Sequence, residues 1–358
     1  MFDLNRAMAY NGMMGDAEKF SNLPEKFRFF AFESPEFSII VLSFQNEYND
    51  LVKDGMCGPK TINKMILQND SLATIKLIEG KGFFLWKSSH AIPEYTNKND
   101  LKNKIEQWAK ILWSGNIKYI LIKTADGRSR HNSDTLELIS KILPDYGISV
   151  YPWVYSWNYE DPSKIQTQVD IHNRTYEILG SPGIFVVNAE KGMKKERDGK
   201  TIPDYKKQAA EYMKKLKALT GATIYLSSYG FVKSHVSIYP FEEMVEGCDI
   251  ISPQCYASAK GYHKNPEKCL ERSEKIEWRK FNNQKKPIMP SLGCWQKREN
   301  GIWLNSWHNE KQIVKAMDWL KTNNKSCSTF WLWLKPGKKF GNIKFSERQW
   351  EAIKTYDW

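Results

Sequence analysis

An alternation of strand-like and helix-like segments, running from Lys81 to the end of the chain, most constrains the fold of this sequence. Eight short apolar runs rich in β-forming residues have the pattern of buried strands. They cover residues 82–88, 117–124, 149–157, 184–188, 223–229, 249–256, 287–295 and 329–334. Amphipathic helix patterns separate or follow them at residues 101–113, 133–143, 165–179, 204–219, 266–281, 310–321 and 346–356, with a weaker segment at 241–246.

Strands that alternate with helices predict a parallel sheet, because each helix returns the chain to the edge where the next strand begins. Eight such units over about 275 residues are the count and length of a (β/α)8 barrel. A doubly wound open sheet is the alternative, but no GxGxxG segment follows the first strand. We therefore expect an α/β chain in which residues 81–358 form a TIM-type (β/α)8 barrel.

Residues 1–80 have a different character and predict a small all-α domain. The turn-forming pairs Asp54-Gly55 and Gly58-Pro59 follow short helical patterns, and Thr61 can cap the helix that comes next. A resemblance to the FQ…L..DG..GP.T signature of the helical peptidoglycan-binding domains rests on Phe44, Gln45, Asp54, Gly55, Gly58, Pro59 and Thr61. The resemblance implies a three-helix module that holds the protein on the bacterial cell wall.

The carboxyl ends of the predicted strands carry the candidate binding residues, since the chemistry of such barrels lies at that end. These positions are mostly aromatic or hydrogen-bonding, which is typical of a sugar-binding groove and not of a phosphate site. The candidate substrate contacts are Trp86, Lys123, Trp153, Tyr155, Trp157, Tyr229, Gln254, Tyr256, Trp295, Trp331 and Trp333.

Two carboxylates fall among these strand ends. Glu190 follows the apolar run 184–187, and partial burial there can raise the pKa of a glutamate until it holds a proton near neutrality. That property suits the general acid of glycoside hydrolysis. Asp126 is the candidate second carboxylate, although its ADGR segment is also an ordinary turn. The alternative for Glu190 is a structural ion pair with Lys191.

Asn188 lies two residues before Glu190 and therefore on the same face of the strand. Sugars of peptidoglycan carry 2-acetamido groups, whose oxygen can attack the anomeric carbon of the same sugar. Such a route needs one acid and a polar group that orients the acetamide, a role that suits Asn188. A turn residue that ends the strand is an equally good interpretation of Asn188.

The barrel pattern also resembles the family 25 glycoside hydrolases, the lysozyme-like barrels common in phage endolysins. In that family the fourth strand ends in Asp-x-Glu with the glutamate as general acid, and here Asn188, Ala189 and Glu190 stand at those positions. The glutamate therefore matches and the aspartate does not. The family's first strand ends in an acidic residue, whereas residues 85–89 read LWKSS.

Composition narrows the remaining classes of function. A formal net charge of +12 favours an anionic partner such as an acidic wall polymer, but no zinc-finger, helix-turn-helix or RNP pattern supports nucleic acid. The six cysteines show no CxxC pair, and the six histidines show no metal-binding spacing, so we expect neither a metal nor another cofactor. A papain-like peptidase is disfavoured because Cys255 and Cys294 fall within predicted strands.

No secretory signal and no membrane-spanning segment is visible in the sequence. We expect a monomeric peptidoglycan hydrolase of the endolysin type, with residues 1–80 as wall-binding domain and residues 81–358 as glycosidase. It would be made in the host cytoplasm and act on the wall after release, or be carried in the virion. The alternative is a non-catalytic wall-binding or virion structural protein with a degenerate barrel.

Overall fold

The computed structural model divides into two compact units, Met1–Ile75 and Lys76–Trp358. It describes residues 75–358, except 132, 257–261, 263, 300–301, 305–307 and 342, together with residues 11, 38, 41, 42, 45, 56 and 61 of the first unit. The second unit begins at Lys76, before the predicted boundary at residue 81, because the backbone N–H groups of Lys76 and Ile78 bond to the Thr223 and Tyr225 hydroxyls of the barrel.

In the first unit, the described part of the predicted wall-binding signature consists of Gln45 and Thr61. Both are buried, and the Gln45 amide Nε2 donates to the Thr61 hydroxyl at 3.3 Å and to the Met56 carbonyl at 3.0 Å. These two residues therefore stabilise the unit internally. The other signature residues lie outside the described ones: Phe44, Asp54, Gly55, Gly58 and Pro59.

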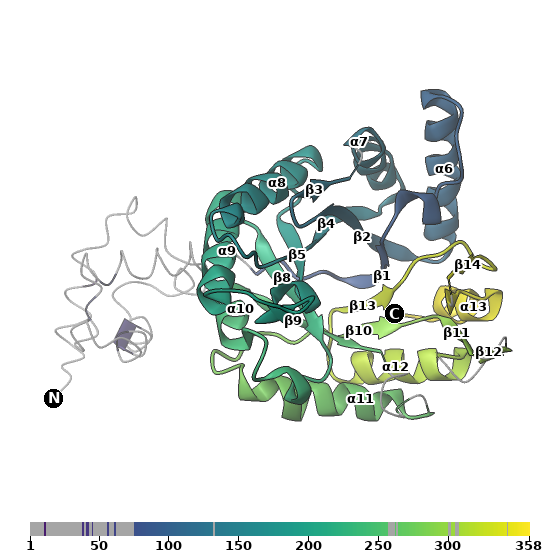
Figure 1. Ribbon diagram of the computed structural model, residues 1–358. Coiled ribbons are helices and arrows are strands. Elements are labelled where there is room, and N and C mark those ends of the chain that lie inside the picture. The colour runs from purple at the N-terminus through teal and green to yellow at the C-terminus, as the bar shows by residue number, and fades with distance from the viewer. Residues whose placement is uncertain are drawn as a thin grey trace. The chain divides into compact units, whose positions relative to one another are not determined.

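The second unit is a closed barrel of parallel strands (Figure 1). Its sheet has nine strands, of which β3 (Ser129–Arg130) is a short antiparallel addition to β2. The eight others are β1 (Gly80–Leu85), β2 (Ile117–Asp126), β4 (Ser149–Tyr155), β5 (Ile184–Asn188), β8 (Thr223–Tyr229), β9 (Ile250–Cys255), β10 (Ser291–Gly293) and β13 (Cys327–Trp331). Pairing of β1 with both β2 and β13 closes the ring. The predicted (β/α)8 fold is confirmed.

Helices surround the ring of strands (Figure 1). They are α6 (Lys98–Ser114), α7 (Ser133–Ile142), α8 (Lys164–Ile178), α9 (Tyr205–Thr220), α10 (Phe241–Gly247), α11 (Pro266–Arg272), α12 (Glu310–Thr322) and α13 (Glu347–Thr355). The helix expected over residues 266–281 is interrupted, because α11 passes into a π-helical turn at Ser273–Glu277. None of the helices described is long and apolar enough to span a membrane.

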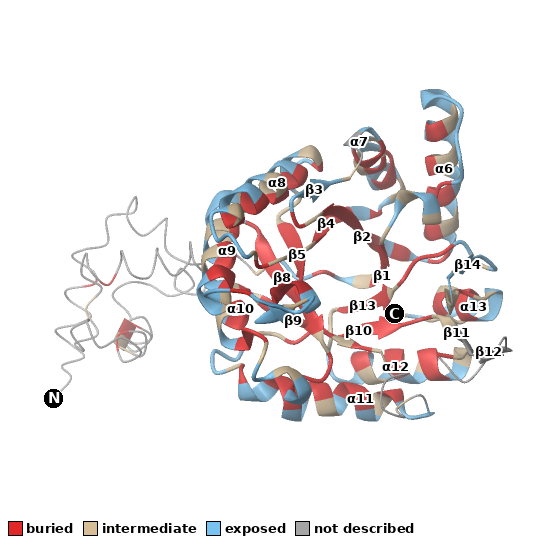
Figure 2. Cartoon of the chain, viewed as in Figure 1, coloured by how far each residue is buried: buried red, intermediate tan, exposed pale blue. Residues whose placement is uncertain are grey.

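The strands are buried because apolar residues face both the barrel interior and the helices (Figure 2). All five residues of β5 are buried. The helices that cover the strands begin at residues suited to capping: Asn97 caps α6, and Asn309 and Ser346 form capping boxes at α12 and α13.

Short antiparallel strands extend the loops at the carboxyl ends of the barrel strands. Between β5 and α9, β6 (Glu196–Arg197) pairs with β7 (Lys200–Thr201). The loops after β10 and β13 form a four-stranded sheet from β11 (Gln296–Glu299), β12 (Ile302–Leu304), β14 (Lys339–Phe340) and β15 (Ile343–Lys344). These short strands therefore belong to the end of the barrel where the catalytic groups were expected.

Lys81 in β1 fastens the last helix to the closed ring. Its buried ammonium donates to the carbonyl oxygens of Ile353 at 2.8 Å, Lys354 at 3.2 Å and Tyr356 at 2.8 Å, at the end of α13. Burial lowers the pKa of Lys81 to about 8, so the amine is still protonated at neutral pH. A cation here also suits the partial negative charge of a helix carboxyl end.

Lys81→Met should lower the free energy of unfolding by about 2–3 kcal/mol, because three buried carbonyl groups lose a charged donor. Urea denaturation at mildly acidic pH, where the amine is charged, measures this. Lys118→Met at the exposed neighbouring position is the matched control and should change stability by less than about 0.5 kcal/mol. Equal stability of the two variants would contradict a fastening role for Lys81.

Candidate active site

Glu190 lies directly beyond β5, at the carboxyl end of the barrel. It precedes a turn of 3-10 helix at Lys191–Met193. The backbone before it is firmly held: the Ala189 carbonyl accepts hydrogen bonds from the Ser228 hydroxyl at 2.6 Å and the Tyr239 hydroxyl at 2.8 Å. The fixed backbone therefore sets the direction in which the Glu190 carboxyl projects.

The Gln254 side chain, on β9, joins the polar groups of this strand end. Its amide Nε2 lies 2.8 Å from Glu190 Oε1, 3.1 Å from Asn188 Oδ1 and 3.3 Å from Ser227 Oγ. Asn188 is only 4% exposed, so its amide is part of a buried hydrogen-bonded cluster. Gln254 therefore links the Glu190 carboxyl to Asn188 and Ser227 through one amide group.

Burial raises the pKa of Glu190, because a charged carboxylate loses hydration there. Donation from Gln254 and Asn188 and the positive charge of Lys194 oppose this shift without reversing it. The hydroxyls of Tyr155 and Tyr229 lie near enough for the negative charge of Glu190 to contribute to their raised pKa values. The site therefore contains a carboxyl group whose pKa lies above that of an ordinary glutamate, among neutral phenols.

Asp126, the other predicted carboxylate, is held by two neighbours at the end of β2. Its Oδ2 pairs with the Lys123 ammonium at 2.7 Å, and its Oδ1 accepts from the Trp157 indole N–H at 2.6 Å. Lys123 is 6% exposed, and its ammonium lies 5.1–5.7 Å from the ring centroids of Trp86, Trp153 and Tyr155. Asp126 thus balances a cation enclosed by aromatic rings.

The aromatic residues of the mouth gather around Trp331, the last residue of β13. Its ring centroid lies 5.7 Å from that of Trp153, 6.3 Å from Trp86 and 6.4 Å from Tyr256. Tyr256 in turn meets Trp295 edge-on at 5.0 Å. Trp153 is fully buried and donates to the Leu85 carbonyl, so it forms the floor, while Trp86, Trp295 and Trp331 remain partly exposed.

Trp333 does not lie in the barrel mouth with these aromatic residues. It is 1% exposed and packs against Trp108 of α6 and Trp350 of α13, with ring centroids 6.3 and 5.4 Å away. The prediction placed it in the mouth because it falls at the end of the apolar run 329–334, but β13 already ends at Trp331. Trp333 is therefore a core residue of the strand–helix interface.

The sequence pattern did not identify three residues of the β5–α9 loop that complete the site. A Cβ on Gly192 would lie 2.4 Å from the Ser156 carbonyl oxygen, so only glycine allows this close approach. Lys194 lies 5.3 Å from the Tyr229 ring centroid, and Arg197 lies 4.6 Å from that of Trp157. The only sequence signal for the two cations was the concentration of basic residues in residues 191–200, KGMKKERDGK.

The opposite end of the barrel contains a cavity of about 460 Å³. The start of β1, β2 and β4 lines it, including Lys81, Tyr119 and Tyr151. Its only carboxylate-bearing lining residue is Glu79, and in barrels of this type that end serves stability. We therefore place the chemistry at the Glu190 end.

No family model matches the sequence, and neither does any curated protein. Solved structures do share the fold. A GH113 β-1,4-mannanase has a TM-score of 0.53 at 12% identity, with 78% of this chain and 98% of that chain covered. The spore cortex-lytic enzyme SleL of Bacillus megaterium has a TM-score of 0.50 at 8% identity, covering 78% and 74%. A chitinase of Bacteroides thetaiotaomicron has a TM-score of 0.50 at 9% identity, covering 72% and 90%.

Gln254→Met should raise the pKa of Glu190 further, because the lost hydrogen bond favoured the ionised carboxylate. Carbon-13 NMR titration of labelled glutamate measures the shift, with Glu190→Gln identifying the resonance. Ser227→Ala, which leaves the Gln254–Glu190 bond in place, is the control and should shift the pKa less. An unchanged or lowered pKa in Gln254→Met would show that Gln254 does not hold the carboxylate.

Proposed function

We propose that this protein is a glycoside hydrolase that cleaves β-1,4 bonds in the glycan strands of peptidoglycan. One observation carries the proposal: a half-buried Glu190 whose pKa is raised stands at a strand end of an aromatic-lined barrel mouth, fixed by Gln254. Aromatic faces suit the apolar faces of sugar rings, and a glutamate of raised pKa suits protonation of a leaving sugar oxygen. The structurally similar mannanase, chitinase and spore cortex-lytic enzyme are consistent with a glycan substrate.

In this proposal Glu190 gives its proton to the glycosidic oxygen as the bond to the anomeric carbon breaks. Both oxygens of Asp126 are already bonded to Lys123 and Trp157, so attack by Asp126 would have to disrupt that unit. We therefore favour the acetamide oxygen of the substrate as nucleophile, with Asn188 beside Glu190 orienting it. Water then opens the cyclic intermediate and gives a proton to the Glu190 carboxylate.

The first unit supplies the wall-binding function in this proposal, and the barrel acts as a monomer. The domain signature around Gln45 and Thr61 supports this division of labour. The same combination fits a phage lytic enzyme that reaches the wall from the host cytoplasm after release. A non-catalytic wall-binding protein is the rival, and purified sacculi separate the two, because only a glycosidase releases soluble reducing ends.

Glu190→Gln should reduce release of reducing ends by about 10²–10⁴-fold, because the amide keeps the shape but has no acidic proton. Thermal unfolding should be nearly unchanged, which separates lost chemistry from lost structure. Near-normal lysis by this variant would exclude the proposed acid. Absence of lysis by the wild-type protein would favour the binding protein.

Asn188→Ala tests attack by the substrate acetamide group, and Asp126→Asn tests attack by a second carboxylate. Loss of activity in Asp126→Asn alone would have two explanations, because this variant also leaves the Lys123 ammonium buried without a counter-charge. The double variant Lys123→Met/Asp126→Asn removes both charges and is the cleaner test. We expect it to keep more activity than Glu190→Gln; a loss as large as that of Glu190→Gln would favour a two-carboxylate mechanism.

A chain of residues 76–358 should still cleave soluble glycan fragments but bind insoluble wall less tightly. The cut keeps the bonds from the backbone N–H of Lys76 to the Thr223 hydroxyl and of Ile78 to the Tyr225 hydroxyl, which a cut at residue 81 would lose. Co-sedimentation with sacculi measures retention. Equal sedimentation of the short and full chains would remove the binding role from residues 1–75.

A further inference from the structure

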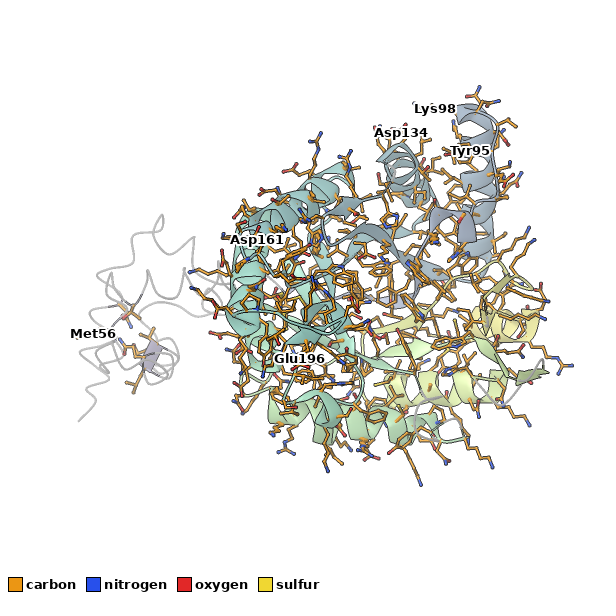
Figure 3. The ribbon with its side chains drawn as sticks, viewed as in Figure 1. Met56, Tyr95, Lys98, Asp134, Asp161 and Glu196 are labelled. Atoms are coloured by element: carbon orange, nitrogen blue, oxygen red, sulfur yellow. The ribbon has the colours of Figure 1, made fainter. Side chains whose placement is uncertain are left out.

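Two cations of the β5–α9 loop stand on either side of Glu190. Arg197 lies over the Trp157 ring, beyond the end of β4, and Lys194 lies over the Tyr229 ring, at the end of β8. Because β4, β5 and β8 are neighbours in the sheet, the order around the mouth is Arg197, Glu190, Lys194. The loop that carries both cations also carries Glu196, which Figure 3 labels.

Lys194 and Arg197 form no ion pair within 4 Å of a carboxylate in the part of the chain that the structure describes, although the Lys194 charge reaches Glu190 over a longer distance. Arg197 donates to the carbonyl oxygens of Asn158 at 2.8 Å and Gly192 at 3.3 Å, and neither cation forms an ion pair with any described carboxylate. Other cations of the same loop do: Lys191 pairs with Asp198 at 3.0 Å and Lys200 with Glu160 at 3.2 Å. Lys195 of this loop also lacks an ion pair with a described carboxylate, but Lys194 and Arg197 are the two cations that lie over aromatic rings beside the acid.

Both cations are held in place while keeping contact with solvent. Each is partly exposed, and a cation over an aromatic ring has a preferred position without losing its charge. The two carbonyl bonds of Arg197 restrict it further, since they leave part of its guanidinium available. Such a pre-positioned cation loses little side-chain entropy when it binds an anion.

We propose that Lys194 and Arg197 form a binding site for the carboxylate substituents of the glycan, so that the preferred substrate is a carboxylated amino-sugar polymer. The inference rests on the proposed glycosidase function and specifies its substrate class. A neutral glycan would leave two cations next to the catalytic acid without a partner. Carboxylates on alternate sugars near the cleaved bond give them partners, through charge-assisted hydrogen bonds.

Binding at Lys194 also affects Glu190 itself. Among the groups facing Glu190 are Gln254 and Asn188, which are neutral, and the hydroxyls of Tyr155, Tyr229 and Tyr256, whose pKa values are all raised, so that the phenols are uncharged near neutral pH. Lys194 is the charged group that acts on Glu190, and its charge favours the ionised carboxylate. A bound substrate carboxylate offsets that charge, so Glu190 keeps its proton to higher pH when the carboxylated substrate is present.

The test uses the full chain and a matched pair of substrates. One is an oligomer of alternating N-acetylglucosamine and N-acetylmuramic acid; the other is the same oligomer with each carboxyl group reduced to an alcohol. Lys194→Met should raise KM for the carboxylated oligomer about tenfold and leave KM for the reduced oligomer unchanged. Lys200→Met is the control, because it removes one charge from the same loop at an exposed, ion-paired position.

A second readout is the alkaline limb of the kcat profile. In the wild-type protein it should lie at higher pH for the carboxylated oligomer than for the reduced one, and Lys194→Met should abolish the difference. Lys194→Arg should retain it, because the charge remains. Arg197→Gln should raise KM for the carboxylated oligomer but leave the pH of the alkaline limb of the kcat profile unchanged, since Lys194 still acts on Glu190.

The outcomes separate this inference from the proposed function. Equal KM values for the two oligomers in the wild-type protein, or equal effects of Lys194→Met and Lys200→Met, would overturn the carboxylate site while leaving the glycosidase intact. Cleavage of neither oligomer by the wild-type protein would overturn the glycosidase. In that case binding of the carboxylated oligomer, measured by calorimetry on Glu190→Gln and on Glu190→Gln/Lys194→Met, still decides whether the cations recognise it.

Discussion

Pairing of β1 with both β13 and β2 is the constraint on which the rest of this structure depends. It joins the first and last strands of the barrel, far apart in the sequence, and so brings eight strand ends to one rim. The interior allows this closure because Gly82 leaves space for the Tyr119 ring of β2, whose hydroxyl bonds Thr329 of β13 over the intervening β1 at 2.6 Å. Glu190 beyond β5 and Gln254 on β9 meet through the pairing of both strands with β8, and closure adds Trp331 of β13, whose ring lies 5.7 Å from that of Trp153 on β4.

Different surroundings give the two carboxylates of the mouth different tasks. Glu190 is surrounded by amides and phenols and loses hydration, so its pKa is raised. Asp126 is bonded to a buried ammonium and an indole N–H, so its charge is matched within the protein. One group is thus suited to releasing a proton, and the other to supporting a cation beneath the aromatic floor.

The sequence allowed the barrel and Glu190 to be predicted because both depend on local patterns. Buried parallel strands appear as apolar runs, and a residue that follows such a run must lie at the rim. The contacts that each residue makes in the folded protein could not be predicted from such local patterns. The bond between Asp126 and Trp157 joins different βα loops, and Trp333 turns into the core only because β13 ends two residues earlier. These depend on where strands end and how loops fold back, which residue periodicity does not encode.

The cations of the mouth show why the net charge of the chain does not identify the residues that could bind an anionic ligand. Lys123 is neutralised by Asp126 and enclosed by three rings, so it contributes to the architecture and offers little to a ligand. Lys194 and Arg197 are seated on aromatic rings as well, but their charge is left open toward solvent. The difference is the presence or absence of an internal carboxylate. Because these cations are held beside Glu190 without an ion-pair partner among the described carboxylates, the proposed function assigns the missing anion to the substrate.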